Sequence, residues 1–213
     1  MPTGLFQRLL RLFFYLLYHQ FSWAYDWVAA LVSLGQWKDW VRATLPYIEG
    51  PNVLEIGYGP GHLQVDLSQK GFKPIGVDAS LPMARQASRR LAASGCGPLL
   101  VIGYAQFLPF PSQSFHNVVA TFPTKFIFDA YALAEIKRLL VPGGKLIALP
   151  VAWINGPRWF DRLAAWLFHV TGQAPKWDDR FIQPFLKAGF AIETRMIEVK
   201  SSQILLLIAT KPP

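Results

Sequence analysis

Three glycines at alternate positions follow a short apolar run that contains one carboxylate, in V-L-E-I-G-Y-G-P-G-H-L at residues 53–63. Glycine has no Cβ, so Gly57, Gly59 and Gly61 let the backbone turn sharply and let a ligand approach it closely. A helix that begins after the turn would aim its free N–H groups at the same place. The spacing is G-x-G-x-G rather than the G-x-G-x-x-G of dinucleotide folds, and no G-K-[ST] of a triphosphate cradle follows. The turn therefore predicts a nucleotide-like ligand, and its neighbours decide which one.

Two acidic residues close to this turn narrow the choice of ligand. Glu55 lies two residues before Gly57, where its charge would repel a pyrophosphate but suit a cationic or amine-bearing ligand. Asp78 ends the next expected strand, where an acidic side chain can accept both hydroxyls of a ribose. Taken singly, Glu55 would make a cap or loop hydrogen bond and Asp78 a helix cap. Together with the glycine spacing they favour S-adenosyl-L-methionine, which has an amino-acid tail, a sulfonium charge and a ribose diol but no phosphate.

Metal and acid–base chemistry find little support in the sequence. The single Cys96 excludes an internal disulfide and a multi-cysteine zinc site. His19, His62, His116 and His169 are scattered without the spacing of a metal site, so no metal is expected. Methyl transfer mainly requires the nucleophile and the methyl group in line at about 3–3.5 Å. His62 and His169 are candidate bases, but a lone histidine is more often structural, so no catalytic residue is predicted.

The charge of the chain bears on its partners. It carries 21 basic and 13 acidic residues, a net charge of +8 that is spread along the whole length. No dense Lys/Arg block is present, so no nucleic-acid groove is expected. Hydrophobic residues make up 52% of the sequence and charged residues only 16%, which is apolar for a soluble protein. A positive surface near an anionic membrane explains this balance better.

Residues 5–18, L-F-Q-R-L-L-R-L-F-F-Y-L-L-Y, predict an amphipathic helix, because polar or amphipathic side chains recur every three or four positions. Its longest apolar run is far shorter than the roughly 20 residues of a membrane span, and no cleavage site of a secretory signal follows. The helix either lies in a membrane interface or covers a core surface or a substrate tunnel. We favour the interface, because the apolar side is wider than one packing seam needs. The predicted location is cytoplasmic and peripheral at the inner membrane face.

From residue 51 onward, short apolar runs alternate with helical periods, a pattern that predicts a parallel sheet with helices on both faces. The expected strands are 52–57, 73–78, 99–103, 115–121 and 145–150, and the expected helices are 61–70, 80–93, 129–140 and 178–188. Residues 190–199 and 203–210 predict an antiparallel hairpin at the C-terminus. The expected fold class is therefore α/β: a doubly wound, seven-stranded, mostly parallel sheet ended by one reversed strand.

Two segments stand outside this alternation and give the predicted domain organisation. Residues 1–50 are expected to form an N-terminal helical cap that faces the membrane, and residues 51–213 the ligand-binding domain. Within that domain the segment 153–170 predicts an amphipathic helix, part of a lid inserted at about 153–175. Trp159, Phe160 and Trp166 would roof an apolar acceptor, and the alternative is ordinary core packing.

Four motifs follow one another in residues 51–150. They are E-I-G-Y-G-P-G at 55–61, G-V-D-A-S-L-P-M at 76–83, G-Y-A-Q-F-L-P-F-P-S-Q-S-F-H-N-V-V at 103–119 and E-I-K-R-L-L-V-P-G-G-K-L at 135–146. In this order they resemble the motifs of the class I S-adenosylmethionine-dependent methyltransferases. Y-D-W-V-A-A-L-V-S-L-G-Q-W-K-D-W at 25–40 is similar to a segment of the ubiquinone and menaquinone biosynthesis C-methyltransferases, although it lacks their asparagine and histidine.

The resemblance implies ten donor-binding residues. They are Tyr25, Glu55, Gly57, Gly59, Asp78, Ala79, Ser80, Tyr104, Ala105 and Thr121. In this assignment Glu55 and the two glycines line the amino-acid tail of the donor, and Asp78 binds its ribose. The residues at 79 and 80 flank the adenine, and Tyr25 closes over the donor. Tyr104 departs from the family pattern, in which an acid accepts the adenine amino group.

Open α/β sheets bind substrates at the carboxyl ends of their strands, so Phe122 and Pro123, beside Thr121, are expected to form the wall that faces the methyl group. The predicted function is methyl transfer to an apolar small-molecule or lipid-like acceptor, either a quinol precursor or a phospholipid amine. The alternative is a non-catalytic, membrane-associated binding module that keeps the fold, since a fold alone does not establish chemistry. No oligomeric state is predicted.

Overall fold

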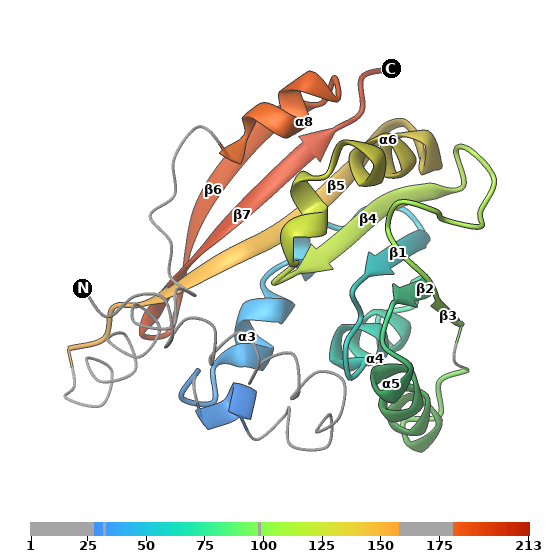
Figure 1. Cartoon of the computed structure of the whole chain (residues 1–213). Helices are drawn as coiled ribbons and strands as arrows, with labels where there is room; N and C mark the ends of the chain where they lie inside the picture. Colours follow the sequence, from blue (N-terminus) through green and yellow to red (C-terminus); the bar gives the residue numbers. More distant parts are fainter. Residues whose placement is uncertain (1–27, 32, 98, 158–180) are drawn as a thin grey trace, which may run out of the picture.

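A seven-stranded sheet carries helices on both of its faces (Figure 1). The computed structural model describes residues 28–31, 33–97, 99–157 and 181–213. The predictions for the segment 5–18, for Tyr25 and for Trp159, Phe160 and Trp166 lie outside these residues. Among the described residues, no helix reaches the length and apolar character that a membrane crossing requires.

The strands are β1 (Asn52–Ile56), β2 (Lys73–Asp78), β3 (Leu100–Ile102), β4 (Phe115–Thr121), β5 (Leu140–Ile154), β6 (Ala191–Val199) and β7 (Ser202–Thr210). They are arranged in the order β3-β2-β1-β4-β5-β7-β6. The first five run parallel, and β7 is antiparallel to both of its neighbours. This arrangement confirms the predicted fold class, with β7 as its reversed strand.

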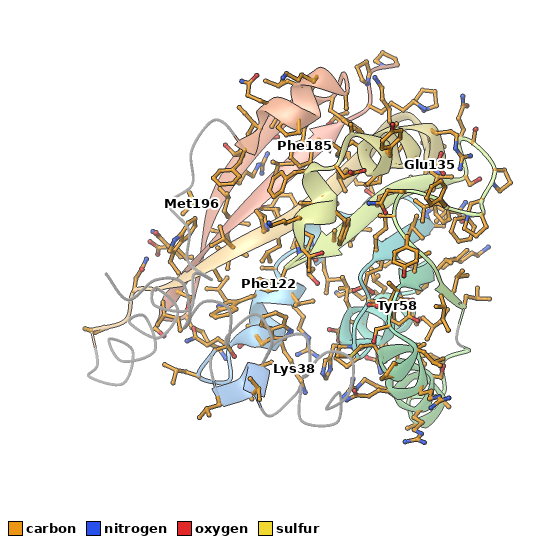
Figure 2. All side chains as sticks on the ribbon, in the orientation of Figure 1. Lys38, Tyr58, Phe122, Glu135, Phe185 and Met196 are labelled. Atoms are coloured by element: carbon orange, nitrogen blue, oxygen red, sulfur yellow. The ribbon has the colours of Figure 1, made fainter. Side chains whose placement is uncertain are left out.

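The helices divide between the two faces of the sheet. They are α3 (Trp37–Arg42), α4 (His62–Gln69), α5 (Leu81–Ala93), α6 (Ala130–Leu139) and α8 (Gln183–Lys187), with short 3-10 turns at Leu45–Tyr47 and Lys125–Phe128. On one face Leu54 of β1 packs in one apolar cluster with residues of α6 and with Phe185 of α8 (Figure 2). On the other face Val53 packs with Trp40 of α3 and Leu63 of α4. Because side chains alternate along a strand, Glu55 lies on the same face as Val53.

Two caps fix where the helices beside the candidate site begin. The Ser80 side chain accepts a hydrogen bond from the N–H of Met83 at 3.4 Å and starts α5. The Asp129 side chain accepts from the N–H of Ala132 at 3.0 Å and starts α6, as the sequence predicts. Both caps satisfy N–H groups that have no partner inside the helix.

The fifth strand is longer than the sequence indicates. Leu140 already pairs with Phe115 of β4, so the strand begins five residues before the predicted start at 145, and residues 141–144 lie within it as an irregularity of the pairing. At the other end Trp153 and Ile154 pair with β7, so the prediction that a helix begins at 153 is wrong at these two residues. The reason is that β7 offers β5 a continuous partner, and the register shift between Ala148 and Val151 lets the pairing continue.

The N-terminal part of the described chain belongs to the packing of this sheet. Trp40 of α3 is fully buried, and Arg42 forms a two-armed ion pair with Asp66 of α4, both contacts measuring 2.9 Å. A domain boundary at residue 50 stays a prediction. The segment before it is in contact with α4, the helix that follows the glycine turn.

Candidate functional site

The glycine turn lies where the strand order reverses. β1 is flanked by β2 on one side and β4 on the other, and the chain builds the sheet outward in both directions from this point. Open α/β sheets bind their ligands in the crevice outside the carboxyl ends of the strands at such a position. The structure brings the turn 57–61, Asp78 and Thr121 to this edge, since each directly follows or ends a strand there.

The three glycines of the turn have different physical reasons to be glycine. All three have positive φ, at 79° for Gly57, 50° for Gly59 and 81° for Gly61. A Cβ on Gly59 would meet nothing within 4 Å, and one on Gly57 would come only to 3.9 Å from the ring of Phe126. A Cβ on Gly61 would lie 2.8 Å from the Cβ of Ala87 in α5. Gly57 and Gly59 therefore border open space that a ligand can enter, whereas Gly61 lets α5 pack against the turn.

Asp78 holds this turn in place. Its Oδ2 accepts the backbone N–H of Gly59 and its Oδ1 accepts that of Ser80, each at 2.8 Å, and the residue is 3% exposed. Its own carbonyl accepts the N–H of Gly103 at 3.1 Å, which ties the end of β2 to the chain after β3. The ribose role of Asp78 stays a prediction, and its clamping of the turn was not expected from the sequence.

Glu55 is a buried carboxylate beside the same turn. It is 1% exposed, and its Oε2 accepts a hydrogen bond from Nε2 of Gln64 in α4 at 2.8 Å. The pKa of Glu55 is raised to about 8, mainly by burial; the Gln64 hydrogen bond opposes this rise, and the negative charges of Asp78 and Asp66 contribute to it. Strongly shifted carboxylates in such places are typical of functional sites.

Gln64 was missed by sequence reasoning. It is 1% exposed on the face of α4 that also buries Leu63 and Leu67. The available signal was a polar residue between two apolar ones on the inner face of the helix.

Tyr58, inside the turn, points away from the open space beside Gly57 and Gly59. Its ring covers Gly76 of β2, where a Cβ would come to 2.6 Å from the ring, and it packs with Ala84 and Ala87 of α5 (Figure 2). Its hydroxyl is buried without a hydrogen-bond partner. Burial, with the charges of Asp78 and Glu55, raises the pKa of Tyr58. The tyrosine therefore anchors the turn to the β2–α5 layer.

The residues predicted to surround the adenine lie beside the ends of β2 and β3. Ala79 is exposed and Ser80 is buried at the start of α5. Ala105 is 5% exposed, whereas Tyr104 is 66% exposed. Their donor contacts stay predictions. The exposure of the Tyr104 ring is compatible with stacking on a flat base.

The predicted acceptor wall is an aromatic cluster. Phe122 follows β4 with φ at +49°, and its N–H donates to the carbonyl of Leu149 at 2.7 Å. Its ring stacks on Trp37 of α3 with centroids 4.1 Å apart, and the ring of Trp40 lies at 6.0 Å (Figure 2). Pro123 is half-buried beside it. The sequence did not reveal the two tryptophans, because they come from a helix that precedes the sheet.

A separate cavity of about 740 Å³ lies between α6, α8 and the C-terminal tail. It is lined by four basic residues, but two of them already serve helix ends: Lys137 donates to the carbonyl of Ala188 at 2.8 Å and Lys211 to that of Leu140 at 2.7 Å. Cations at the carbonyl ends of helices are ordinary stabilising contacts. In the part of the chain that the structure describes, no group of three or more His, Cys, Asp or Glu residues is arranged to hold a metal.

Comparisons with known proteins show which family this chain belongs to. A family model described as "Methyltransferase domain" matches residues 53–144. The demethylmenaquinone methyltransferase of Roseiflexus castenholzii is 30% identical over 167 residues, which cover 71% of this chain and 68% of that protein. The demethylmenaquinone methyltransferase of Thermobifida fusca is 34% identical over 58% of this chain and 54% of that protein. The chain thus spans about half the length of the latter relative.

The fold also has a close solved counterpart. The YcgJ protein from Bacillus subtilis has a TM-score of 0.63 at 16% identity, over 82% of this chain and 99% of that chain. At this identity the likeness concerns the fold alone, and the family follows from the sequence relatives. The matched residues contain the glycine turn, Glu55 and Asp78. The chain belongs to the class I S-adenosylmethionine-dependent methyltransferase family, near its ubiquinone and menaquinone biosynthesis group.

Proposed function

We propose that this protein transfers the methyl group of S-adenosylmethionine to a ring carbon of an apolar quinol precursor. The donor half rests on the glycine turn, which has open space beside Gly57 and Gly59 and two buried acids next to it. Residues 57–61 themselves include no lysine or arginine that would bind a phosphate. The acceptor half is supported by the relatives, which are named demethylmenaquinone methyltransferases.

The residues of the chain act by positioning the donor. The bound donor supplies a methyl group that is already activated by a positive sulfur. Asp78, which holds the Gly59 amide at the end of β2, binds the ribose hydroxyls of the donor. Glu55 provides negative charge for the amino-acid tail. Methyl transfer gains most from alignment, so a rigid turn contributes more than an acid–base residue would.

In this proposal the acceptor ring lies at the carboxyl end of β4, against Thr121, Phe122 and Pro123. The ring of Phe122 is held in place by stacking on the ring of Trp37. Aromatic side chains in this position present an apolar, flat surface that suits a quinol ring.

We also propose peripheral contact with a membrane, because a long-tailed quinol precursor resides there. The net charge of +8 and the amphipathic pattern of residues 5–18 support this contact. Each basic residue near an anionic surface contributes about 1 kcal/mol to such binding. The contact is expected to be stronger on anionic vesicles and weaker in salt.

The test is transfer of label from methyl-labelled donor to vesicles of two kinds. One kind contains demethylmenaquinone reduced to its quinol, and the other contains phosphatidylethanolamine in its place. We expect label in the quinol only. Label in the phospholipid alone would replace the quinol by a phospholipid amine as acceptor. Donor binding without label in either would favour a non-catalytic binding module.

Two aspartate variants separate the site from the fold. Asp78→Asn is expected to weaken donor binding by about tenfold or more, since a hydrogen bond to a charged group is worth about 1.5–3 kcal/mol. Asp129→Asn, at the cap of α6, is the matched control, because asparagine caps a helix as well as aspartate does. If both variants bind the donor equally well, the assignment of Asp78 is refuted.

A further inference from the structure

Glu55 and Gln64 form a buried polar pair, in which Gln64 has no role implied by the family resemblance. Each residue is 1% exposed, and the Nε2 of Gln64 donates to the Oε2 of Glu55 at 2.8 Å. The pair joins the end of β1 to α4 across the glycine turn, because the two residues stand on either side of it. Within the described part of the chain, Gln64 is the side chain that donates a hydrogen bond to this carboxylate.

The charges around Glu55 are negative. Asp78 at the end of β2 and Asp66 on α4 both act on it through their charge, and the phenol of Tyr58 lies close enough to respond to it. Arg42 of α3 is committed to Asp66 at 2.9 Å. The neighbouring residue on β4 is Val119, which does not titrate. Among the described residues, no basic side chain forms an ion pair with Glu55, so its ionised form has to be met by a cation from a ligand.

We propose that Gln64 is a positioning residue for the donor: it orients the Glu55 carboxylate toward the amino group of the donor's amino-acid tail, and donor binding is coupled to loss of a proton from Glu55. This inference rests on the proposed function. On binding, the O–H bond of the Glu55 carboxyl breaks and the proton passes to the buffer, while the ammonium group of the donor stays protonated. The Gln64 hydrogen bond strengthens in the same step, because its acceptor becomes charged.

Proton release is measured by calorimetry at about pH 7 in buffers with different ionisation enthalpies. Since the pKa of Glu55 is about 8 in the free protein, we expect close to one proton released for each donor bound. The demethylated product keeps the same amino group and is expected to release the same proton. The Glu55→Gln protein is expected to release none, and it also reports any contribution of the donor itself.

Gln64→Leu tests the positioning role with a residue of similar size. We expect the dissociation constant and the KM for the donor to rise by about 10- to 150-fold, the worth of a hydrogen bond to a charged group. The kcat at saturating donor is expected to stay close to that of the native protein. Gln69→Leu, at an exposed position of the same helix, is the matched control and is expected to leave both constants unchanged.

Two results would overturn the inference. One is donor binding without proton release in the native protein, a measurement that does not depend on any variant folding. The other is a folded Gln64→Leu protein that binds the donor as tightly as Gln69→Leu does. Absence of donor binding in the native protein is a different outcome, and it refutes the proposed function instead.

Discussion

Glu55→Gln is expected to stabilise the donor-free protein, and the gain is expected to grow with pH. Glutamine keeps the shape of the side chain and can still accept the hydrogen bond of Gln64, but it cannot ionise. In the native protein the pKa of Glu55 is about 8 in the folded state, against 4.5 for an ordinary glutamate in water. Since one pKa unit corresponds to about 1.4 kcal/mol, the difference amounts to a free energy on the order of 5 kcal/mol.

The sign follows from which state binds the proton. Between pH 4.5 and about 8 the folded protein keeps the Glu55 proton and the unfolded chain has lost it. The free energy of unfolding of the native protein therefore falls as pH rises through this window, and the loss is complete above the folded pKa. Glu55→Gln lacks this slope, so the two proteins are expected to be similar near pH 4.5 and to differ by several kcal/mol above about pH 8.

Urea unfolding followed by tryptophan fluorescence at several pH values between about 5 and 9 gives both slopes. Glu198→Gln, at an exposed position of β6, is the control, and its slope is expected to match that of the native protein. Parallel slopes for Glu55→Gln and the native protein would refute the reasoning, as would a variant that is less stable at every pH. The same variant is expected to bind the donor poorly, so stability and function would move in opposite directions, which is typical of a functional site.

Three further predictions concern the frame of the site. Urea unfolding is expected to show Gly61→Ala destabilised by about 1–3 kcal/mol more than Gly71→Ala. Both glycines have positive φ (81° and 84°), but only a Cβ at Gly61 would meet a neighbouring Cβ. Equal losses of unfolding free energy in the two variants would contradict this. Tyr58→Phe removes a buried hydroxyl without a partner, so the melting temperature is expected to hold or rise, and a clear fall would show a missed hydrogen bond. The hydrogen bond from Arg138 lowers the pKa of Glu135, so this contact stabilises the fold above the ordinary glutamate pKa of 4.5 and the stabilisation is lost as the pH falls below it. In Arg138→Met the free energy of unfolding is therefore expected to depend less on pH on the acid side, and an unchanged pH dependence would contradict this.

The sheet could be predicted because its evidence is local. The strands at 73–78 and 115–121 have the bounds that their apolar runs indicate, and the glycine turn marks the end of β1. The length of β5 could not be predicted in this way, because it depends on pairing with β7, about fifty residues later in the chain. The same limit applies to Phe122, whose ring is fixed by Trp37 from a helix on the other side of β1 in the sequence.

The glycines of the turn meet two different physical requirements with the same residue type. Gly59 borders open space and Gly61 touches α5, yet both appear in the sequence as members of one spaced pattern. A pattern reports that a backbone conformation recurs, whereas the neighbour that demands it comes from tertiary packing. In the structure Gly59 leaves open space beside the turn, and Gly61 lets α5 pack against it.

Glu55 and Asp78 are both carboxylates beside the glycine turn, but their hydrogen-bond partners differ. Both carboxylates are buried at the same edge of the sheet, and both were expected to touch the donor. Asp78 accepts two backbone N–H groups, which belong to the turn and to the start of α5, so it has a structural task whether or not a ligand is present. Glu55 accepts one side-chain amide and faces negative neighbours. Since a buried charge needs a partner, Glu55 has the stronger physical reason to await a cation, and it is the acid whose state donor binding is expected to change.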